Sequence, residues 1–289
     1  MTDLKTLMRL AIDEAKISLK EGDKGFGAVI AVDGRIIARA RDAEMSSADP
    51  TAHAEITAIR ATAAKLGRDL SGCVMVSTHE PCPMCTAAAL WSGISEIAYG
   101  FSIKEAIRQQ RKRIDISCRE IFKRAGKKLL VHPGVLNTEC SVLYNRAVRD
   151  EINRLRGSDR ARLEKLADAL SARRLKWYSE NQSHLNVDGK DIIGGAYQLF
   201  TAKLGVAAKD APVIRRDEKK LVLHSRNFCP TLEACKILNL DTRFVCRHLT
   251  EKPTTDLLRR LHPKLRFARN YDKLRPHTPY CEEMIVLDE

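Results

Sequence analysis

Four side chains at short spacings form the most reactive pattern in this sequence. One residue separates His53 from Glu55, and two residues separate Cys82 from Cys85. One imidazole and two thiolates are ligands typical of zinc, and three protein ligands leave the fourth tetrahedral position open to water. We therefore expect a catalytic Zn²⁺ site formed by His53, Cys82 and Cys85.

Glu55 has a different expected role from the three ligands. Residues two apart on a helix do not share a face, so Glu55 is expected to reach past the metal towards a substrate. A carboxylate beside a zinc-activated water molecule can take its proton and pass it to a leaving nitrogen. The sequence thus predicts Glu55 as the catalytic proton shuttle.

The elements that must position these residues alternate between strands and helices. Pro81 and Pro83 suit the first turn of a helix, where the helix dipole also stabilises a thiolate. The Asp33-Gly34 pair predicts a hairpin between the first two strands. After that hairpin, the alternation predicts a three-layer α/β/α sandwich with a mixed sheet. The expected strands cover residues 26–32, 35–41, 73–78 and 94–99, and the expected helices begin near residues 4, 51 and 83.

The remaining residues predict a connector and a second domain. A helical pattern runs from about Thr138 to Asn181 with a break at Gly157. We therefore expect a domain over residues 1–145, a helical connector over 146–183 and a small α+β domain over 184–289. Cysteines in this last segment predict either a second metal or thiol site or inert buried thiols, which pack as small hydrophobes; they are Cys229, Cys235, Cys246 and Cys281.

Length and composition restrict the class of protein. The 289 residues suit two domains, and no apolar run approaches the roughly 18 residues of a membrane span. The first ten residues carry Asp3, Lys5 and Arg9 in place of a signal-peptide core. We expect a cytoplasmic protein without a membrane partner, whose nine cysteines stay reduced.

The positive charge is concentrated in the middle of the chain. The net charge is +13, but residues 1–100 have a balance of −2 and residues 101–182 a balance of +10. The basic runs at 108–113 and 123–128 could meet phosphates. The alternative is a solvated helix face, because these runs lack the interleaved aromatic residues on which bases stack.

Three segments resemble the cytidine deaminase superfamily. They are Asp49-Pro50-Thr51-Ala52-His53-Ala54-Glu55-Ile56, Glu80-Pro81-Cys82-Pro83-Met84-Cys85 and Trp91. The resemblance covers about residues 1–145 and is strongest to the guanine and nucleoside deaminase branch, followed by the bacterial tRNA adenosine deaminases. It implies a five-stranded sheet with helices on both faces and a homodimer. It also implies hydrolysis of an amino group on a heteroaromatic ring to a carbonyl and ammonia.

The same resemblance implies a set of substrate-binding residues. Phe26, Gly27, Ala54 and Trp91 occupy positions near the expected pocket. Asp42 stands where these two branches usually have Asn, whose amide contacts the base. A carboxylate only accepts hydrogen bonds, so the preferred ring would present N–H groups or a positive charge there. The alternative is that Asp42 points to solvent.

Three functions are consistent with these residues. The first is a zinc hydrolase acting on a small heterocyclic amine, and the second is a tRNA adenosine deaminase. The third is a ligand-binding or nucleic-acid-binding protein with structural zinc. Glu55 argues against the third, because a structural site fills all four positions with protein ligands. The balance of −2 over residues 1–100 disfavours a nucleic-acid partner.

The segment from Cys229 to Cys281 weakly resembles the L-2-amino-thiazoline-4-carboxylate hydrolases. The resemblance extends over about 100 residues and includes Cys246-Arg247 and Pro279-Tyr280-Cys281. It implies a small α+β domain that binds a small ligand or performs a second hydrolytic step.

Overall fold

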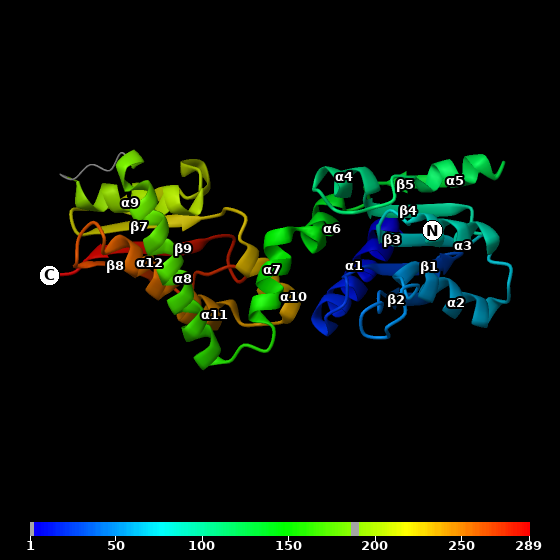
Figure 1. Cartoon of the computed structure of the whole chain (residues 1–289), viewed down its shortest axis with the longest axis horizontal. Coiled ribbons are helices and arrows are strands. Elements are labelled where there is room, and N and C mark those ends of the chain that lie inside the picture. The colour runs from blue at the N-terminus through cyan, green and yellow to red at the C-terminus, as the bar shows by residue number, and fades with distance from the viewer. Residues whose placement is uncertain (1–2, 186–190) are drawn as a thin grey trace. The chain divides into compact units, whose positions relative to one another are not determined.

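The computed structural model describes residues 3–185 and 191–289 and divides into two compact units (Figure 1). The first unit comprises Met1–Asn153 and the second Arg154–Glu289. Residues 146–183, over which a helical connector is expected, are helical on both sides of this boundary, and the expected break near Gly157 lies between two helices. A separate connector stays a prediction.

The first unit contains five strands and most of the helices expected from the sequence. The strands are β1 (Gly27–Val32), β2 (Arg35–Arg41), β3 (Val74–His79), β4 (Glu96–Phe101) and β5 (Leu130–Pro133). The helices are α1 (Leu4–Glu21), α2 (Ala54–Leu66), α3 (Pro83–Trp91), α4 (Ile103–Arg108), α5 (Cys118–Arg124), α6 (Asn137–Tyr144) and α7 (Arg146–Leu155), whose last two residues belong to the second unit.

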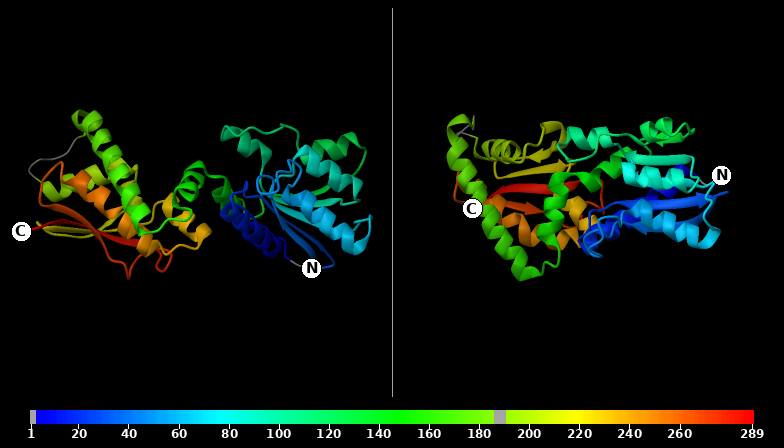
Figure 2. Two further views of the ribbon diagram at one scale, coloured as in Figure 1. Left: turned by 60° about the horizontal axis from the view of Figure 1, so that its bottom comes forward. Right: turned by 45° about the vertical axis from the view of Figure 1, so that its right-hand side comes forward.

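The five strands form one mixed sheet in the order β2-β1-β3-β4-β5. Strand β1 runs antiparallel to β2 and β3, and β3, β4 and β5 are mutually parallel. Helix α1 packs on β1, β2, β3 and β4, and α6 also packs on β4 (Figure 2). Helix α2 contacts β1, β2 and β3, and its neighbour α3 packs beside it. The predicted three-layer α/β/α sandwich with a five-stranded mixed sheet is confirmed.

The sheet topology places the beginnings of α2 and α3 at the same edge. Strands β2 and β3 are both antiparallel to β1, so they point in the same direction and end at one edge of the sheet. The chain enters α2 after β2 and α3 after β3. Apolar residues on both helices and on β1, β3 and β4 form one buried cluster beneath them; it includes Ile30, Ala58, Met75, Ala89 and Ile97.

The second unit has the expected α+β composition. Its antiparallel sheet has the order β6-β7-β9-β8, and helices α9 and α12 pack on it. The strands are β6 (Val213–Arg216), β7 (Lys220–Ser225), β8 (Leu265–Arg269) and β9 (Cys281–Leu287). The helices are α8 (Arg160–Asn181), η1 (Gln182–His184), α9 (Ile192–Leu204), η2 (Ala208–Asp210), α10 (Pro230–Leu238), α11 (Thr242–Leu249) and α12 (Glu251–Leu258).

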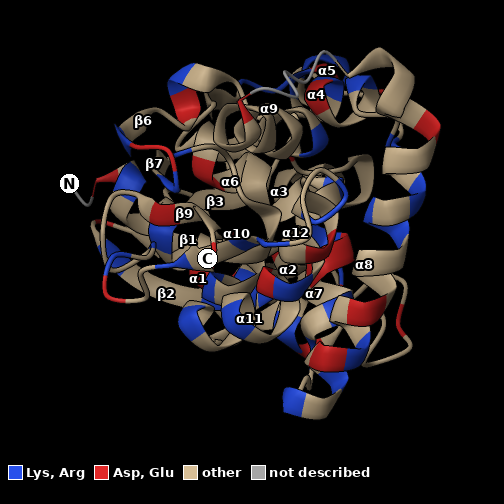
Figure 3. Cartoon of the chain, turned by 90° about the vertical axis from the view of Figure 1, so that its left-hand side faces the viewer, with Lys and Arg blue, Asp and Glu red and all other residues tan. Residues whose placement is uncertain are grey.

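Charged residues of both signs are interspersed along α8 (Figure 3). Two pairs four residues apart form ion pairs there, Arg160 with Glu164 and Lys176 with Glu180. Such i,i+4 pairs on an exposed helix face are typical of a solvated surface. In the first unit, Lys123 and Arg124 lie in the last turn of α5, where the helix dipole favours cations.

The described part of the chain contains one three-residue group of the type expected for zinc, formed by His53, Cys82 and Cys85. In the second unit, Cys235 is buried and the other three cysteines are partly buried. No three His, Cys, Asp or Glu ligand atoms lie within 4.8 Å of one another among the described residues of that unit. A second metal site on these cysteines is therefore not formed. None of the described helices is long and apolar enough to cross a bilayer.

The close packing of α1 on β1 depends on Gly27. A methyl group at this position would lie 1.9 Å from the carbonyl oxygen of Ala11 and 2.8 Å from the amide nitrogen of Ala15. Both atoms are backbone, so the overlap is relieved only by moving the helix. We predict that Gly27→Ala lowers the free energy of unfolding of the full chain by about 3 kcal/mol or more. Denaturant titration followed by circular dichroism measures this loss.

Gly126→Ala is the control for this substitution. Its new methyl group meets no atom within 4 Å, and only the positive φ of 65° opposes it. The expected loss is about 1–2 kcal/mol. Equal losses for the two variants would contradict the packing argument.

Candidate functional site

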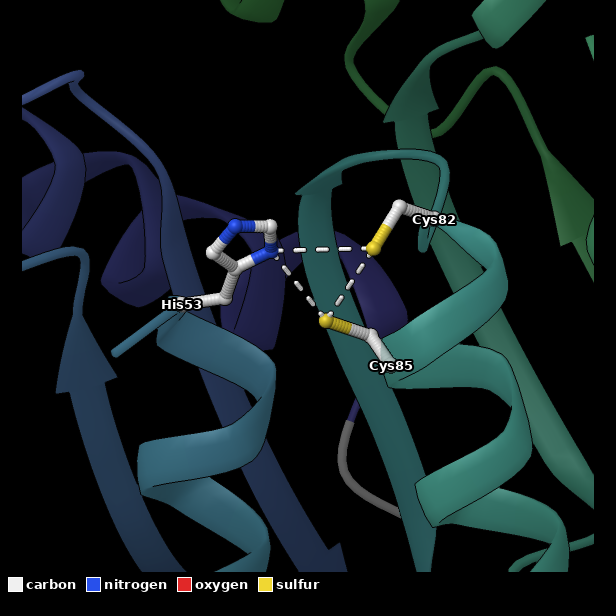
Figure 4. A group of neighbouring side chains, drawn as sticks. All are labelled: His53, Cys82 and Cys85. Atoms are coloured by element: carbon white, nitrogen blue, oxygen red, sulfur yellow. Dashed lines mark hydrogen bonds between the residues drawn. The ribbon is translucent and has the colours of Figure 1, made fainter. Parts of the chain in front are cut away.

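His53, Cys82 and Cys85 point towards one another from two neighbouring helices (Figure 4). The Nδ1 atom of His53 lies 3.6 Å from Sγ of Cys82 and 3.4 Å from Sγ of Cys85. The two sulfur atoms are 3.6 Å apart. His53 and Cys82 are the N-cap residues of α2 and α3, and Cys85 lies in the first turn of α3.

The three atoms have the separations that a tetrahedral zinc ion requires. With Zn–S bonds of about 2.3 Å and a Zn–N bond of about 2.0–2.1 Å, the edges of the ligand tetrahedron are about 3.8 Å between two sulfur atoms and about 3.5 Å between sulfur and nitrogen. The observed edges agree with these values within about 0.2 Å. The donor set fits zinc in its chemistry as well, because thiolate and imidazole suit this borderline-soft ion.

Local sequence features hold each ligand in place. Asp49 accepts hydrogen bonds from the Thr51 amide and hydroxyl, which closes the turn that precedes α2. Pro83 occupies the first position of α3, where an amide N–H would have no partner within the helix. His53 and Cys82 both have extended backbone angles, as N-cap residues do, so their side chains project from the helix ends.

The protonation states of the metal-free ligands are strongly coupled. A hydrogen bond with Cys85 lowers the pKa of Cys82 to about 4 despite its burial. A hydrogen bond to that sulfur raises the pKa of His53 to about 9. The pKa of Cys85 is raised by its contact with Cys82 and by burial. At neutral pH the metal-free site therefore holds one thiolate, one thiol and one imidazolium.

Glu55 lies beside these ligands without belonging to the three-residue group. It is buried in the first turn of α2, and its Oε2 atom is 3.6 Å from Sγ of Cys85. The Ser77 hydroxyl donates a hydrogen bond of 3.0 Å to its Oε1 atom. Burial, followed by the negative charge of Cys82, raises the pKa of the Glu55 carboxyl. A raised pKa suits a group that takes up and returns a proton near neutral pH.

Two carboxylates lie near His53 on the other side of its ring. Glu44 Oε2 is 3.6 Å from Nε2 of His53, and Asp42, Glu44 and His53 have ligand atoms within 4.8 Å of one another. A carboxylate near the second ring nitrogen orients a metal-binding imidazole. Sequence reasoning did not identify Glu44, because it belongs to no motif and comes close to His53 only in the folded chain.

A cavity of about 110 Å³ opens next to the site. Phe26, Glu55, His53 and Cys82 of the predicted site residues line it. Further lining residues that the sequence analysis did not assign to a pocket are Lys24, Glu44, His79, Glu80, Ile103, Arg113 and Ile114.

The remaining predicted substrate-binding residues do not line this cavity. Asp42 is fully buried and does not point to solvent; it accepts a hydrogen bond from the Lys24 amide, and its Oδ2 atom has no partner among the described residues. Gly27 donates its N–H to the Thr78 hydroxyl, and Ala54 is buried at the start of α2. Trp91 lies on α3 with 78 % of its surface exposed. Contact of these four residues with a substrate stays a prediction.

His79 forms an uncharged part of the cavity wall. Burial lowers its pKa to about 4, so the ring is neutral at pH 7. Its Nδ1 atom is 2.9 Å from the Glu80 carbonyl oxygen, which can only accept, so the proton is assigned to Nδ1. The rings of Phe26, Phe101 and Tyr144 surround it at centroid distances of 5.3–5.9 Å.

The described geometry agrees with similarity to known proteins. Residues 1–101 match the family described as the cytidine and deoxycytidylate deaminase zinc-binding region. The guanine deaminase of Bacillus subtilis (strain 168) is 41 % identical over 97 residues, which are 33 % of this chain and 62 % of the relative. This chain therefore spans less than two thirds of that enzyme's length.

A second relative is covered over most of its length. The tRNA-specific adenosine deaminase of Buchnera aphidicola subsp. Baizongia pistaciae is 34 % identical over 145 residues, which are 49 % of this chain and 85 % of the relative. A solved structure from a study of A-to-I editing by tRNA:A34 deaminases is 30 % identical, with a TM-score of 0.42. The aligned region covers 48 % of this chain and 98 % of the chain in that structure.

The donor set leads to a prediction about metal content. Protein purified without chelators is expected to contain about one zinc ion per chain, because His53, Cys82 and Cys85 form one binding site. Cys82→Ala and Cys85→Ala are expected to abolish this content, because two ligands hold zinc far more weakly than three. Atomic emission spectroscopy measures it, with Cys118→Ala as the control for loss of a buried thiol outside the site. Zinc-free wild-type protein would contradict the assignment.

The pKa shifts predict that zinc affinity rises with pH. Zinc binds neutral imidazole and thiolates, so binding must release the protons of His53, whose pKa is raised to about 9, and of Cys85, whose pKa is also raised. Raising the pH from 6.5 to 8 makes this release easier. The apparent Kd is expected to fall by up to about a hundredfold per pH unit, as two released protons require. Chelator competition at several pH values measures the slope, and a pH-independent Kd would contradict the shifts.

Proposed function

The chain belongs to the cytidine and deoxycytidylate deaminase family, and we propose from this premise that it is a zinc-dependent hydrolytic deaminase. Its substrate is an exocyclic amine of a nucleobase, a nucleoside or a related heterocycle. Water adds to the ring carbon that bears the amino group, the C–N bond breaks, and the products are a ring carbonyl and ammonia.

The observation that carries this proposal is the position of Glu55. Its carboxylate is buried, lines the cavity and lies 3.6 Å from a zinc-ligand sulfur. A structural zinc site would have a fourth protein ligand in this place, but the ligand group contains only three residues among those described. The arrangement therefore favours a catalytic site over a non-catalytic protein with structural zinc.

Each residue has a definite task in this reaction. His53, Cys82 and Cys85 would hold a zinc ion, which would lower the pKa of a water molecule at the site to about 7. Glu55 takes the proton of the attacking water on a carboxylate oxygen and delivers it to the leaving nitrogen. Ser77, by donating to Oε1, holds the carboxylate in one orientation.

The cavity restricts the part of the substrate that enters it. A volume of about 110 Å³ is room for about four water molecules, which suits a small planar ring. The apolar ring of Phe26 and the neutral imidazole of His79 provide walls for an aromatic heterocycle. Guanine and adenosine relatives both match this chain, so the ring itself has to be identified by experiment.

A tRNA adenosine deaminase is the second candidate. The similarity to the Buchnera enzyme over 145 residues favours it. The negative balance of residues 1–100 disfavours it, because non-specific RNA affinity comes mainly from contacts of Lys and Arg with phosphates. Ammonia release from an adenosine-containing tRNA anticodon arm separates the two candidates.

We predict that zinc-loaded protein releases ammonia from at least one compound in a series of bases, nucleosides, pterins, triazines and tRNA. Glu55→Ala is expected to lower kcat by about 10²-fold to 10⁴-fold, because no described neighbour replaces the proton shuttle. The zinc content and the circular dichroism spectrum of the variant are expected to equal those of the wild type. These two measurements are the control for misfolding.

Two results would contradict this proposal. Zinc-loaded wild-type protein that releases no ammonia from any compound would exclude the activity. Full turnover by Glu55→Ala would assign the proton transfer to another residue.

A further inference from the structure

Three arginines gather beside the cavity of the proposed active site. Arg113 lines the cavity, and its guanidinium carbon lies 5.5 Å from the centroid of the Phe26 ring. Arg149 stacks over the Tyr144 ring at 5.6 Å, and Arg111 donates a hydrogen bond to the Tyr144 carbonyl oxygen. The Tyr144 and Phe26 rings are themselves stacked at 5.3 Å, so two of the cations lie over one aromatic pair and the third contacts its backbone.

These three arginines have little compensation from carboxylates, because Asp42 raises the pKa of Arg149 only against the larger lowering effects of burial and of Arg111. Arg111, Arg113 and Arg149 form no ion pair with a described Asp or Glu, and their hydrogen bonds go to backbone carbonyl oxygens. Burial and then the charge of Arg111 lower the pKa of Arg149 to about 10. Burial and then Arg113 lower the pKa of Arg111. The cations thus repel one another and would be stabilised by an anion.

The other charged groups of the cavity are already paired or bound. Lys24 forms an ion pair with Glu44. Glu80 accepts hydrogen bonds from the amides of Ile103 and Cys118 with its two oxygens. Glu55 belongs to the proton-transfer site. Arg113 is therefore the cavity-lining cation that is available for a ligand.

The positions of the three arginines separate two roles. Arg149 donates to the carbonyl oxygens of Leu143 and Lys24, and Arg111 to that of Tyr144, so both fasten backbone segments. Arg113 makes only a local contact with the Lys112 carbonyl besides the Phe26 ring. Its neighbour Ile114, 62 % exposed, lines the cavity too, so this wall reaches the surface.

We propose that the substrate is a nucleotide and that Arg113 binds its phosphate where the cavity reaches the surface. The inference rests on the proposed deaminase function and narrows its substrate class to nucleotides. A guanidinium presents paired N–H donors that match phosphate oxygens, and the two neighbouring cations strengthen the attraction. Arg113 lies where the cavity wall reaches the surface, so the phosphate is placed at the mouth of the cavity.

The surface beside the cavity has room for the rest of a nucleotide. An open groove of about 820 Å³ shares Glu80 and Ile103 with the cavity. The charged residues of the groove are of both signs: Lys104, Arg108, Arg119 and Arg124 line it together with Glu80, Glu105, Asp115 and Glu120, of which Glu120 is paired with Arg124. The phosphate can belong to a mononucleotide or to the backbone of a single strand, because both present the same anionic oxygens to Arg113.

Binding to a zinc-loaded Glu55→Gln protein tests this inference without turnover. The ligands are adenosine, cytidine and guanosine, each with its 5′-monophosphate, together with five-residue RNAs that contain each base. We expect at least one 5′-monophosphate or RNA to bind about tenfold or more tightly than the nucleoside with the same base. Arg113→Gln is expected to remove this gain. Lys112→Gln removes the charge of an exposed side chain that is adjacent to Arg113 in the sequence. This variant is expected to retain the gain in binding.

The pattern of binding distinguishes the two phosphate sources. A gain for a mononucleotide assigns a free nucleotide, and a gain for the RNA alone assigns a nucleic-acid backbone. Nucleoside and phosphate-bearing ligands that bind equally, or a gain that survives Arg113→Gln, would overturn the inference. Failure of the deaminase proposal has a different signature, which is the absence of ammonia release from every compound by the wild-type protein.

Discussion

The site depends on the convergence of two helix N-termini at one edge of the sheet. Strands β2 and β3 end side by side across β1, and the helices that follow them bring an imidazole and two sulfur atoms within 3.6 Å of one another. Local sequence sets the direction of each side chain, but only the sheet sets the distance between the helices. The small apolar residues of the cluster beneath them, such as Ala58 and Ala89, allow this close approach.

Charge explains why this convergence is suited to a metal. Two sulfur atoms and the Glu55 carboxylate are crowded within a buried volume, where like charges repel more strongly than in water. In the metal-free site the conflict is resolved by protons, as the raised pKa values of His53 and Cys85 indicate. A doubly charged zinc ion would replace the protons of these two ligands and stabilise the thiolates directly.

The surroundings of the ligands extend the same electrostatic pattern. Glu44 faces the far side of the His53 ring and is balanced by Lys24, so the imidazole lies between the ligand group and an ion pair. The arginines near Phe26 carry positive charge without an acidic partner. The negative charges thus lie around the metal ligands and the unpaired positive charges on the aromatic wall, which suits a substrate with a planar ring and an anionic substituent.

Much of the fold and the chemical core of the site could be predicted from the sequence. The alternation of strands and helices, the Asp33-Gly34 hairpin and the spacing of Cys82 and Cys85 are local patterns, and the folded chain contains the elements that they predict. They predicted the mixed sheet, the ligand set and a separate role for Glu55.

Tertiary structure decided the rest of the site. Contact of Asp42 and Trp91 with a substrate stays a prediction, but only the fold shows that the first is buried near His53 and that the second is exposed on α3. Glu44, His79 and Arg113 line the cavity although no motif marks them as a group. Their contacts join loops and strands that are far apart in sequence, and such distances follow from packing of the sheet and helices, not from residue spacing. The sequence by itself therefore predicted which atoms bind a metal and move a proton, and only the folded chain decided which side chains line the cavity beside them.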